Sequence, residues 1–282
     1  MDKNKLLPIP AIVLVIVAAL IPSFILFNYA FQVPYGSPNQ WVGFAHFQEL
    51  LDWSRFTSAV SRTFQFVIAA MAIEIPLGIT LAHWLREKEG PLAEFTENVI
   101  VLPALLPWIT IGLMWRLMIQ AGPITQIMDL IPVINFAPYQ VSWHAFGTLV
   151  ALDVWHWTSL IFIVALAGLG SIPEQRIEAA KAEGASSWQI FRYVELPEIR
   201  FPLTFVVMIR FMDTFRMYDE INVLTGGGPG LSNEFIVMFI NKISLERWEL
   251  GTGAAASLIA LLMVLVGSWA IMMFMTRGEG LL

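Results

Sequence analysis

Long apolar runs alternate with shorter polar segments along most of this chain. Each run is long enough to cross about 30 Å of hydrocarbon as a helix, which takes about 20 residues. No run shows the sustained in-out alternation that a membrane-spanning strand requires. The pattern therefore predicts an all-α integral membrane protein with six transmembrane helices. The predicted spans are 6–31, 62–85, 99–119, 145–170, 201–223 and 253–276.

The composition agrees with this pattern. The 282 residues are 57% apolar and 13% charged, and their mean hydropathy is +0.69. Soluble domains are about 45–50% apolar and about 25% charged. A bundle of six helices accounts for the whole length, 1–282, as a single transmembrane domain. The apolar start, Leu6 to Phe31, is too long for a signal-peptide core, so we expect a retained first helix.

The charge pattern predicts an orientation in the membrane. Both termini and the segments 86–98 and 171–200 carry nine basic residues, and the opposite loops with their margins carry four. The nine are Lys3, Lys5, Arg86, Lys88, Arg176, Lys181, Arg192, Arg200 and Arg277, and the four are Arg55, Arg62, Lys242 and Arg247. The positive-inside rule then predicts that both termini and segment 171–200 lie in the cytoplasm.

Several function classes are disfavoured. The net charge of −6 is spread without a basic tract, so nucleic acid is not an expected partner. The chain has no cysteine, which excludes thiolate metal sites and thiol nucleophiles. It contains no GxxxxGK[ST], HExxH or GxSxG motif, so neither an ATPase nor an intramembrane enzyme is expected. We predict no metal site and no cofactor bound by this chain.

The most densely charged segment, 173–197, has the pattern of a helix, a sharp turn and a second helix. Pro173 can open the first helix, and Gly184 can end it as a cap with positive φ. Ser186 or Ser187 can cap the second helix, which Pro197 is expected to stop. We therefore expect two short helices along the membrane surface rather than a plain connector.

The spacing within this segment is specific. Glu178-Ala179-Ala180 is followed after three residues by Gly184, and after nine more by Val194 and Leu196-Pro197. This resembles the EAA loop of ABC-transporter permeases, which docks into a cytoplasmic ATPase. Glu183 stands where that family often has Asp. The resemblance implies an ATPase-coupling surface made by Glu178, Ala179, Ala180, Glu183, Gly184, Ala185, Ser186 and Trp188.

Other motifs narrow the resemblance to the carbohydrate-uptake branch. The most specific is Leu224-Thr225-Gly226-Gly227-Gly228-Pro229, which is similar to a turn in the maltose-permease-F-like or glycerol-phosphate-permease-A-like subunit. The resemblance implies the type I ABC importer (MetI-like) permease fold in the bacterial inner membrane. It also implies a second permease subunit, two ATPase subunits that bind ATP-Mg, and an extracytoplasmic solute-binding protein.

Charged residues at membrane depth mark pathways or structural pairs. The fifth predicted span holds Arg210, Asp213, Arg216 and Asp219, whose spacing of three places them near one helical stripe. One interpretation is an ion-paired stripe against the sister permease. The other is a polar lining of the substrate path, in which the aspartates accept hydrogen bonds from sugar hydroxyls.

Weaker candidates for the substrate path lie on other spans. Asp153, Trp155 and Trp157 could form a sugar platform or an ordinary interfacial aromatic belt. Gly226 and Gly227 would supply an adaptable turn at the mouth of the path.

Two further charged residues have structural interpretations. Glu74 could face a cavity or another helix. Arg116 could snorkel to the interface or be paired.

The function that these patterns favour is the transmembrane subunit of a binding-protein-dependent ABC importer for a sugar or sugar-like solute. ATP hydrolysis would take place on partner subunits, so the chain is not itself an enzyme. Two alternatives remain open at this level: an ion-coupled secondary carrier, and an ABC permease for a non-sugar solute.

Overall fold

The computed structural model describes residues 9–33, 40–120, 122–130 and 135–276. The start of the first predicted span and the basic residues Lys3, Lys5 and Arg277 lie outside these ranges. The chain divides into two compact units, 1–60 with 236–263 and 61–235 with 264–282. The helices α3 (Ser54–Arg86) and α14 (Leu250–Thr276) contribute residues to both units.

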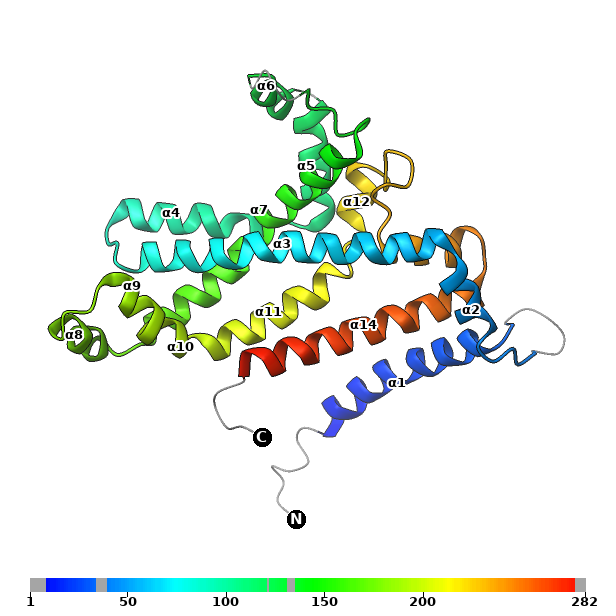
Figure 1. The fold of residues 1–282 in the computed structure, drawn as a ribbon, viewed down its shortest axis with the longest axis horizontal. Helices are drawn as coiled ribbons and strands as arrows, with labels where there is room; N and C mark the ends of the chain where they lie inside the picture. Colours follow the sequence, from blue (N-terminus) through cyan, green and yellow to red (C-terminus); the bar gives the residue numbers. More distant parts are fainter. Residues whose placement is uncertain (1–8, 34–39, 121, 131–134, 277–282) are drawn as a thin grey trace, which may run out of the picture. The chain divides into compact units, whose positions relative to one another are not determined.

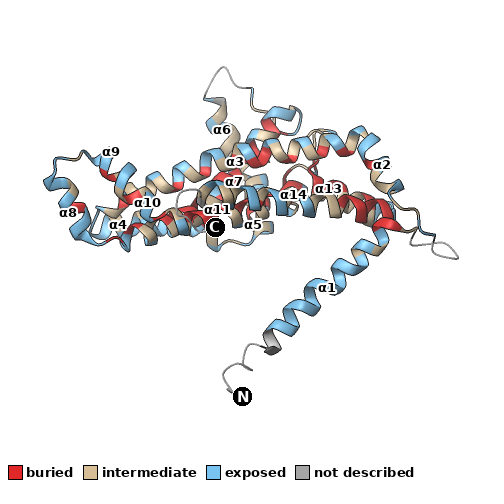
Figure 2. Cartoon of the chain, turned by 60° about the horizontal axis from the view of Figure 1, so that its bottom comes forward, coloured by how far each residue is buried: buried red, intermediate tan, exposed pale blue. Residues whose placement is uncertain are grey.

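The first unit contains helices from both ends of the chain. Its elements, besides the ends of α3 and α14, are α1 (Ile9–Phe31), α2 (Ala45–Asp52), α13 (Ile236–Asn241) and the π-helical turn Lys242–Glu246. Helix α1 packs against α2 at its C-terminal end, where Phe31 contacts the rings of Trp41 and Phe44. Residues 12–25 of α1 are exposed in this chain (Figure 2). Such an apolar surface is stable against lipid or against another helix.

The second unit is built around α7, which carries the largest share of buried residues among the long helices. Helices α4 and α11 both pack against α7, and α12 packs against α5 (Figure 1). The elements before the EAA-like loop are α4 (Pro91–Val101), the 3-10 turn Leu102–Leu105, α5 (Trp108–Gln120), α6 (Pro123–Asp129) and α7 (Ser142–Gly170). The EAA-like loop, residues 171–200, contains α8 (Glu174–Ala182), α9 (Ser187–Ile190), the π-helical turn Phe191–Glu195 and α10 (Leu196–Glu198). It leads into α11 (Arg200–Thr214), which is followed by α12 (Asp219–Leu224).

Four helices in the described part of the chain are long and apolar enough to span a membrane, and a bent pair gives a fifth candidate. The four are α1, α3, α7 and α14, which match the predicted spans 6–31, 62–85, 145–170 and 253–276. Helix α3 begins eight residues before its prediction because Phe56 and Ala59, both buried, continue its apolar face. Polar neighbours hide that face in the sequence.

The predicted span 99–119 is not one continuous helix. The apolar run is divided between α4 and α5, which meet at an angle of 105°. Pro103 and Pro107 cause the break, because proline lacks the N–H that a continuing helix needs. Leu106 is extended, with ψ of 136°, as expected for a residue that precedes proline.

The predicted span 201–223 is also not one continuous helix. Helix α11 ends at Thr214, and α12 begins only at Asp219. Acidic residues are favourable in the first turn of a helix, and Asp219 and Glu220 occupy that turn of α12. The charges that looked like a stripe on one helix therefore lie on two elements and the turn between them.

Candidate functional site

The first half of the EAA-like loop (171–200) ends in a tight cap. Gly184 has φ of +84°, a conformation that glycine adopts without strain. The Ala185 N–H donates to the Ala180 carbonyl and the Gly184 N–H to the Lys181 carbonyl, both at 3.0 Å. These two bonds define a Schellman motif. The cap predicted at Gly184 is confirmed.

The second half begins with a capping box at Ser186. Its Oγ accepts from the Gln189 N–H at 3.4 Å, and its own N–H donates to Gln189 Oε1 at 2.7 Å. Pro197, however, does not end this helix as predicted, since α10 and α11 carry the helical path onward. Pro197 lies at the start of α10, where a missing N–H costs little.

Most of the predicted coupling residues face outward. The structure exposes Glu178, Ala179, Glu183, Gly184, Ser186 and Trp188, and half-buries Ala180 and Ala185. Beside the bend lies a hollow of about 340 Å³, lined by residues of both short helices such as Ala180 and Gln189. No atom lies near the position of a side chain at Gly184, so a partner could approach its backbone closely.

The inner side of the loop is anchored to the membrane helices. Ile177 and Ile190 are buried in an apolar cluster with Leu85 of α3, Leu169 of α7 and Leu203 of α11. Fully burying one aliphatic side chain stabilises a structure by about 1.5–3 kcal/mol. The loop is therefore fixed to the ends of three helices, and a force on it would reach them.

A buried ion cluster joins α3, α7 and α11. The fully buried Arg210 donates to Glu74 in a bidentate pair, from Nε to Oε1 at 3.0 Å and from Nη2 to Oε2 at 3.1 Å. It also donates to Asp153 at 2.8 Å and to Asp213 at 3.3 Å. The guanidinium lies 4.4 Å from the ring centroid of Trp157, within cation–π range.

This geometry assigns Glu74 the interhelical role that the sequence left open. It brings together four candidates from two predicted spans, Asp153 and Trp157 of 145–170 and Arg210 and Asp213 of 201–223. Arg210 is saturated by three carboxylates, so it is not available to an anionic cargo. The sequence could have indicated this cluster, because an arginine within a predicted span requires carboxylate partners on neighbouring helices.

The predicted stripe in the fifth span is only partly observed. Arg210 and Asp213 pair one turn apart on α11. Arg216 and Asp219 are exposed and lie beyond the end of α11. The single stripe is therefore incorrect, because the helix on which its spacing depended stops at Thr214.

The aromatic candidates differ in access. Trp157 has the Arg210 guanidinium against its ring and contacts Trp108, with ring centroids 5.0 Å apart. Trp155 is 37% exposed, and its ring centroid lies 6.2 Å from that of Trp115 on α5. Of the two tryptophans in the predicted platform, Trp155 therefore offers the more open face.

The glycine turn after α12 is held by a buried side chain. Gly226 and Gly227 both have positive φ, which explains why glycine stands at these positions. The buried Asn233 donates from Nδ2 to the Gly228 carbonyl at 2.9 Å, and its N–H donates to the Gly227 carbonyl at 2.9 Å. Sequence reasoning missed Asn233.

Arg116 is paired, since its Nη1 donates to the Val223 carbonyl of α12 at 2.9 Å.

These elements match a known family. A family model described as the binding-protein-dependent transport system inner membrane component covers residues 74–277. The chain belongs to this family. It is a permease, a multi-pass inner-membrane subunit of an ABC importer that works with a periplasmic binding protein and other subunits. ATP is hydrolysed by partner subunits, and an ion-driven carrier is thereby excluded.

The permease is similar to other transport-system permease proteins over most of its length. It is 27% identical over 279 residues to the probable starch degradation products transport system permease protein AmyD of Thermoanaerobacterium thermosulfurigenes, covering 95% of this chain and 91% of AmyD. It is 28% identical over 268 residues to the trehalose/maltose transport system permease protein MalF of Thermococcus litoralis, covering 92% and 88%.

A solved structure shows the same fold. The permease superposes on a chain of a bacterial ABC transporter involved in the import of the acidic polysaccharide alginate, with a TM-score of 0.83 and 19% identity. The match covers 98% of the permease and 95% of that chain. The all-helical membrane permease fold is thus confirmed.

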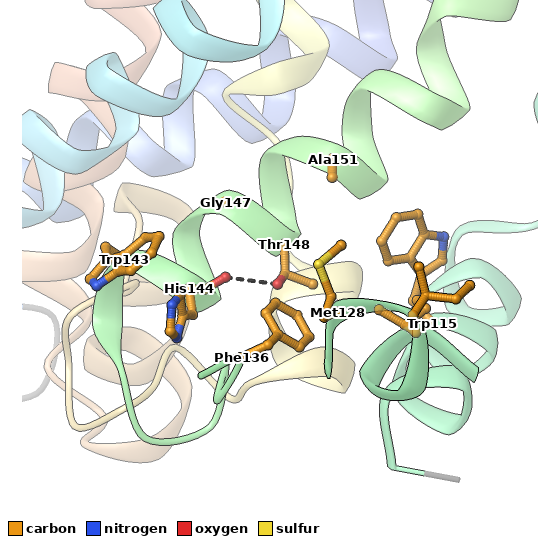
Figure 3. A pocket seen from close by; sticks show the side chains of 10 residues that line it. Trp115, Met128, Phe136, Trp143, His144, Gly147, Thr148 and Ala151 are labelled. Atoms are coloured by element: carbon orange, nitrogen blue, oxygen red, sulfur yellow. Dashed lines mark hydrogen bonds between the residues drawn. The ribbon is translucent and has the colours of Figure 1, made fainter. Parts of the chain in front are cut away.

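The permease also has an apolar pocket that its sequence did not reveal. It measures about 390 Å³ and lies between α5, α6 and the start of α7 (Figure 3). Trp115, Phe136 and Trp143 line it together with His144, whose Nδ1 accepts the Ala137 N–H at 3.2 Å. Among the described residues His144 Nε2 has no hydrogen-bond partner. The described residues hold no group of three side chains placed to bind a metal ion.

Proposed function

We propose that the permease is one of two different transmembrane subunits of a bacterial importer for sugars or sugar-like solutes. Two ATPase subunits would bind the cytoplasmic side, and the solute-binding protein would deliver cargo to the opposite side. We further propose six spans in one permease domain, the type I (MetI-like) arrangement, with both termini in the cytoplasm. The names of the relatives support a sugar, since AmyD and MalF are described as permeases for starch products and for trehalose or maltose.

The observation that carries the coupling part of this proposal is the shape of the EAA-like loop. Its outer side is exposed and bends at Gly184, while its inner side is buried among the ends of α3, α7 and α11. A partner that moves the outer side would therefore move these helices as a lever. We propose Glu178, Ala179, Ala180, Glu183, Gly184, Ala185, Ser186 and Trp188 as the docking surface.

For the substrate path we propose the polar and aromatic residues that remain accessible. Asp213 is half-buried at the edge of the ion cluster, and Arg216 and Asp219 are exposed beyond α11. Trp155 offers an open aromatic face, and Gly226 and Gly227 shape the nearby turn. Arg210, Asp153 and Trp157 contact one another, so we propose that they stabilise the helices beside this path without binding the cargo. A carbohydrate would be held by stacking and by hydrogen bonds to its hydroxyls.

Co-purification tests the docking part. The tagged permease from its native membrane should retain an ATPase and a second permease. Glu178→Lys with Gly184→Asp should lose only the ATPase. Gln175→Lys, exposed on α8 outside the EAA-like pattern, is the control and should retain both partners. Recovery of the wild-type chain alone would overturn the proposal.

Reconstitution tests the cargo. The assembled complex in proteoliposomes should hydrolyse ATP faster when its binding protein is loaded with a cognate mono- or oligosaccharide. Amino acids and peptides should give no stimulation. Stimulation by one of these alone would favour a non-sugar permease with the same architecture.

A further inference from the structure

A second buried ion pair lies where the EAA-like loop meets α3. Glu195 accepts from Arg86 Nη1 at 2.6 Å through Oε1, and its Oε2 lies 2.7 Å from His83 Nδ1. The Glu195 side chain is only 4% exposed, and those of Arg86 and His83 are 19% and 33% exposed. One carboxylate thus bridges two residues that lie one turn apart at the end of α3.

The backbone is locally reshaped at this position. In an α-helix each residue turns by about 100°, so residue 195 would lie about 140° around the helix from Ile190. The π-helical turn Phe191–Glu195 is wider, and both Ile190 and Glu195 are buried. The wider turn thereby puts an ion-pairing residue on the same side as the apolar anchor. Such π-bulges are frequent at functional sites.

The surrounding contacts lead from the proposed docking surface to this carboxylate. The exposed Trp188 lies 5.6 Å from Phe191 between ring centroids. Phe191 in turn lies 4.9 Å from the His83 ring, and His83 meets Glu195. A displacement of Trp188 would therefore reach α3 through packed side chains as well as along the main chain.

We propose that Glu195 is a positioning residue that ties the EAA-like loop to α3 during transport. Through this tie, ATPase closure acts on α3 by an ion pair as well as by the apolar packing that already joins the loop to α3, α7 and α11. The proposal rests on the proposed function, because it needs an ATPase on the loop. It adds a residue that the EAA-like pattern does not contain, since Glu195 lies between the fixed positions Val194 and Leu196.

A neighbouring pair supplies a matched control. Arg176 and Glu198 form an ion pair within the same segment, but their side chains are 56% and 42% exposed. Exposed pairs contribute little, whereas removal of one partner of a buried pair leaves an uncompensated charge. Glu195→Gln and Glu198→Gln therefore make the same chemical change in two different environments.

The test is the amount of sugar transported per ATP hydrolysed by the reconstituted importer. We expect Glu195→Gln to retain the ATPase on co-purification and to lower this ratio at least tenfold. Glu198→Gln should stay within twofold of wild type. An unchanged ratio in Glu195→Gln would overturn the tie. Failure of the wild-type permease to retain an ATPase would instead overturn the proposed function.

A reversible link removes the question of folding. The chain has no cysteine, so Glu195→Cys with His83→Cys creates the one reactive pair. A short, reducible bifunctional thiol reagent applied after assembly should restore the transport ratio that the untreated pair has lost. Reduction should abolish it again. Inactivation by the link would show that the two segments must separate, which contradicts the proposal.

Discussion

At the scale of single residues, the buried Arg210 forms the ion pairs that join α3, α7 and α11. It is fully buried and forms ion pairs with carboxylates from two other helices. Replacing it with an apolar residue leaves Glu74 and Asp153 buried without a cation. Breaking a buried pair in this way typically costs about 3–5 kcal/mol.

We therefore expect Arg210→Met to lower the thermal unfolding temperature of the detergent-solubilised complex sharply. Arg216→Met, on the exposed turn after the same helix, should leave it nearly unchanged. The triple variant with Glu74→Gln and Asp153→Asn should recover part of the loss, because of the three carboxylates only the half-buried Asp213 then keeps an unpaired charge. Equal effects of the two arginine variants would contradict the assigned role of Arg210.

Gly184 is the second position at which the residue type is critical, because the cap between the two short helices requires a positive φ. Its φ of +84° costs an alanine about 1–2 kcal/mol, although the space for a methyl group is open. Gly170 at the end of α7 also has open space for a methyl group, but its φ is ordinary. An alanine there adds the same bulk without the backbone strain, so Gly170→Ala is the control.

Gly184→Ala should make the loop more sensitive to limited proteolysis, and Gly170→Ala should not. Gly184→Pro should go further, because proline fixes φ near −65°. We expect this variant to insert into the membrane yet uncouple ATP hydrolysis from transport. Normal uptake by Gly184→Pro would rule out the lever.

At the scale of elements, close helix packing depends on a glycine of α5. A Cβ atom at Gly112 would lie 3.2 Å from Val223 Cβ of α12. The Val223 carbonyl also accepts the hydrogen bond from Arg116. The two helices therefore approach closely and are tied at the same place.

Gly112→Leu should push α12 away from α5 and destabilise the permease by about 1–3 kcal/mol. Gly147→Leu on α7, where a side chain meets open space, is the matched control. Thermal unfolding of both variants in detergent checks the difference. Equal stability of the two would show that α5 and α12 can separate without cost.

At the scale of the whole molecule, the proposed orientation follows from charge counts alone. It can be tested cleanly, since the chain carries no background thiol. Glu174 at the start of α8 and Leu231 after the glycine turn are both exposed and lie in loops that the prediction assigns to opposite sides.

An impermeant maleimide should label Leu231→Cys from the outside of intact spheroplasts. Glu174→Cys should react only after the membrane is permeabilised. The reverse pattern would invert the orientation and place the EAA-like loop on the wrong side for an ATPase.

The sequence by itself determined the features that depend on local order. Apolar runs of sufficient length predicted α1, α3, α7 and α14. The Gly184 cap and the Ser186 helix start follow from the conformational and hydrogen-bonding preferences of single residues. The EAA-like spacing and the glycine turn also depend on neighbours along the chain, so the family resemblance was readable without a structure.

Only the tertiary structure decided which distant residues meet. Arg210 pairs with Glu74 and Asp153, and Glu195 pairs with Arg86, across separations of 57 to 136 residues that no local pattern encodes. It also decided where apolar runs break, as between α4 and α5. The physical reason is that burial and pairing belong to the packed helices together, while the sequence displays each helix alone.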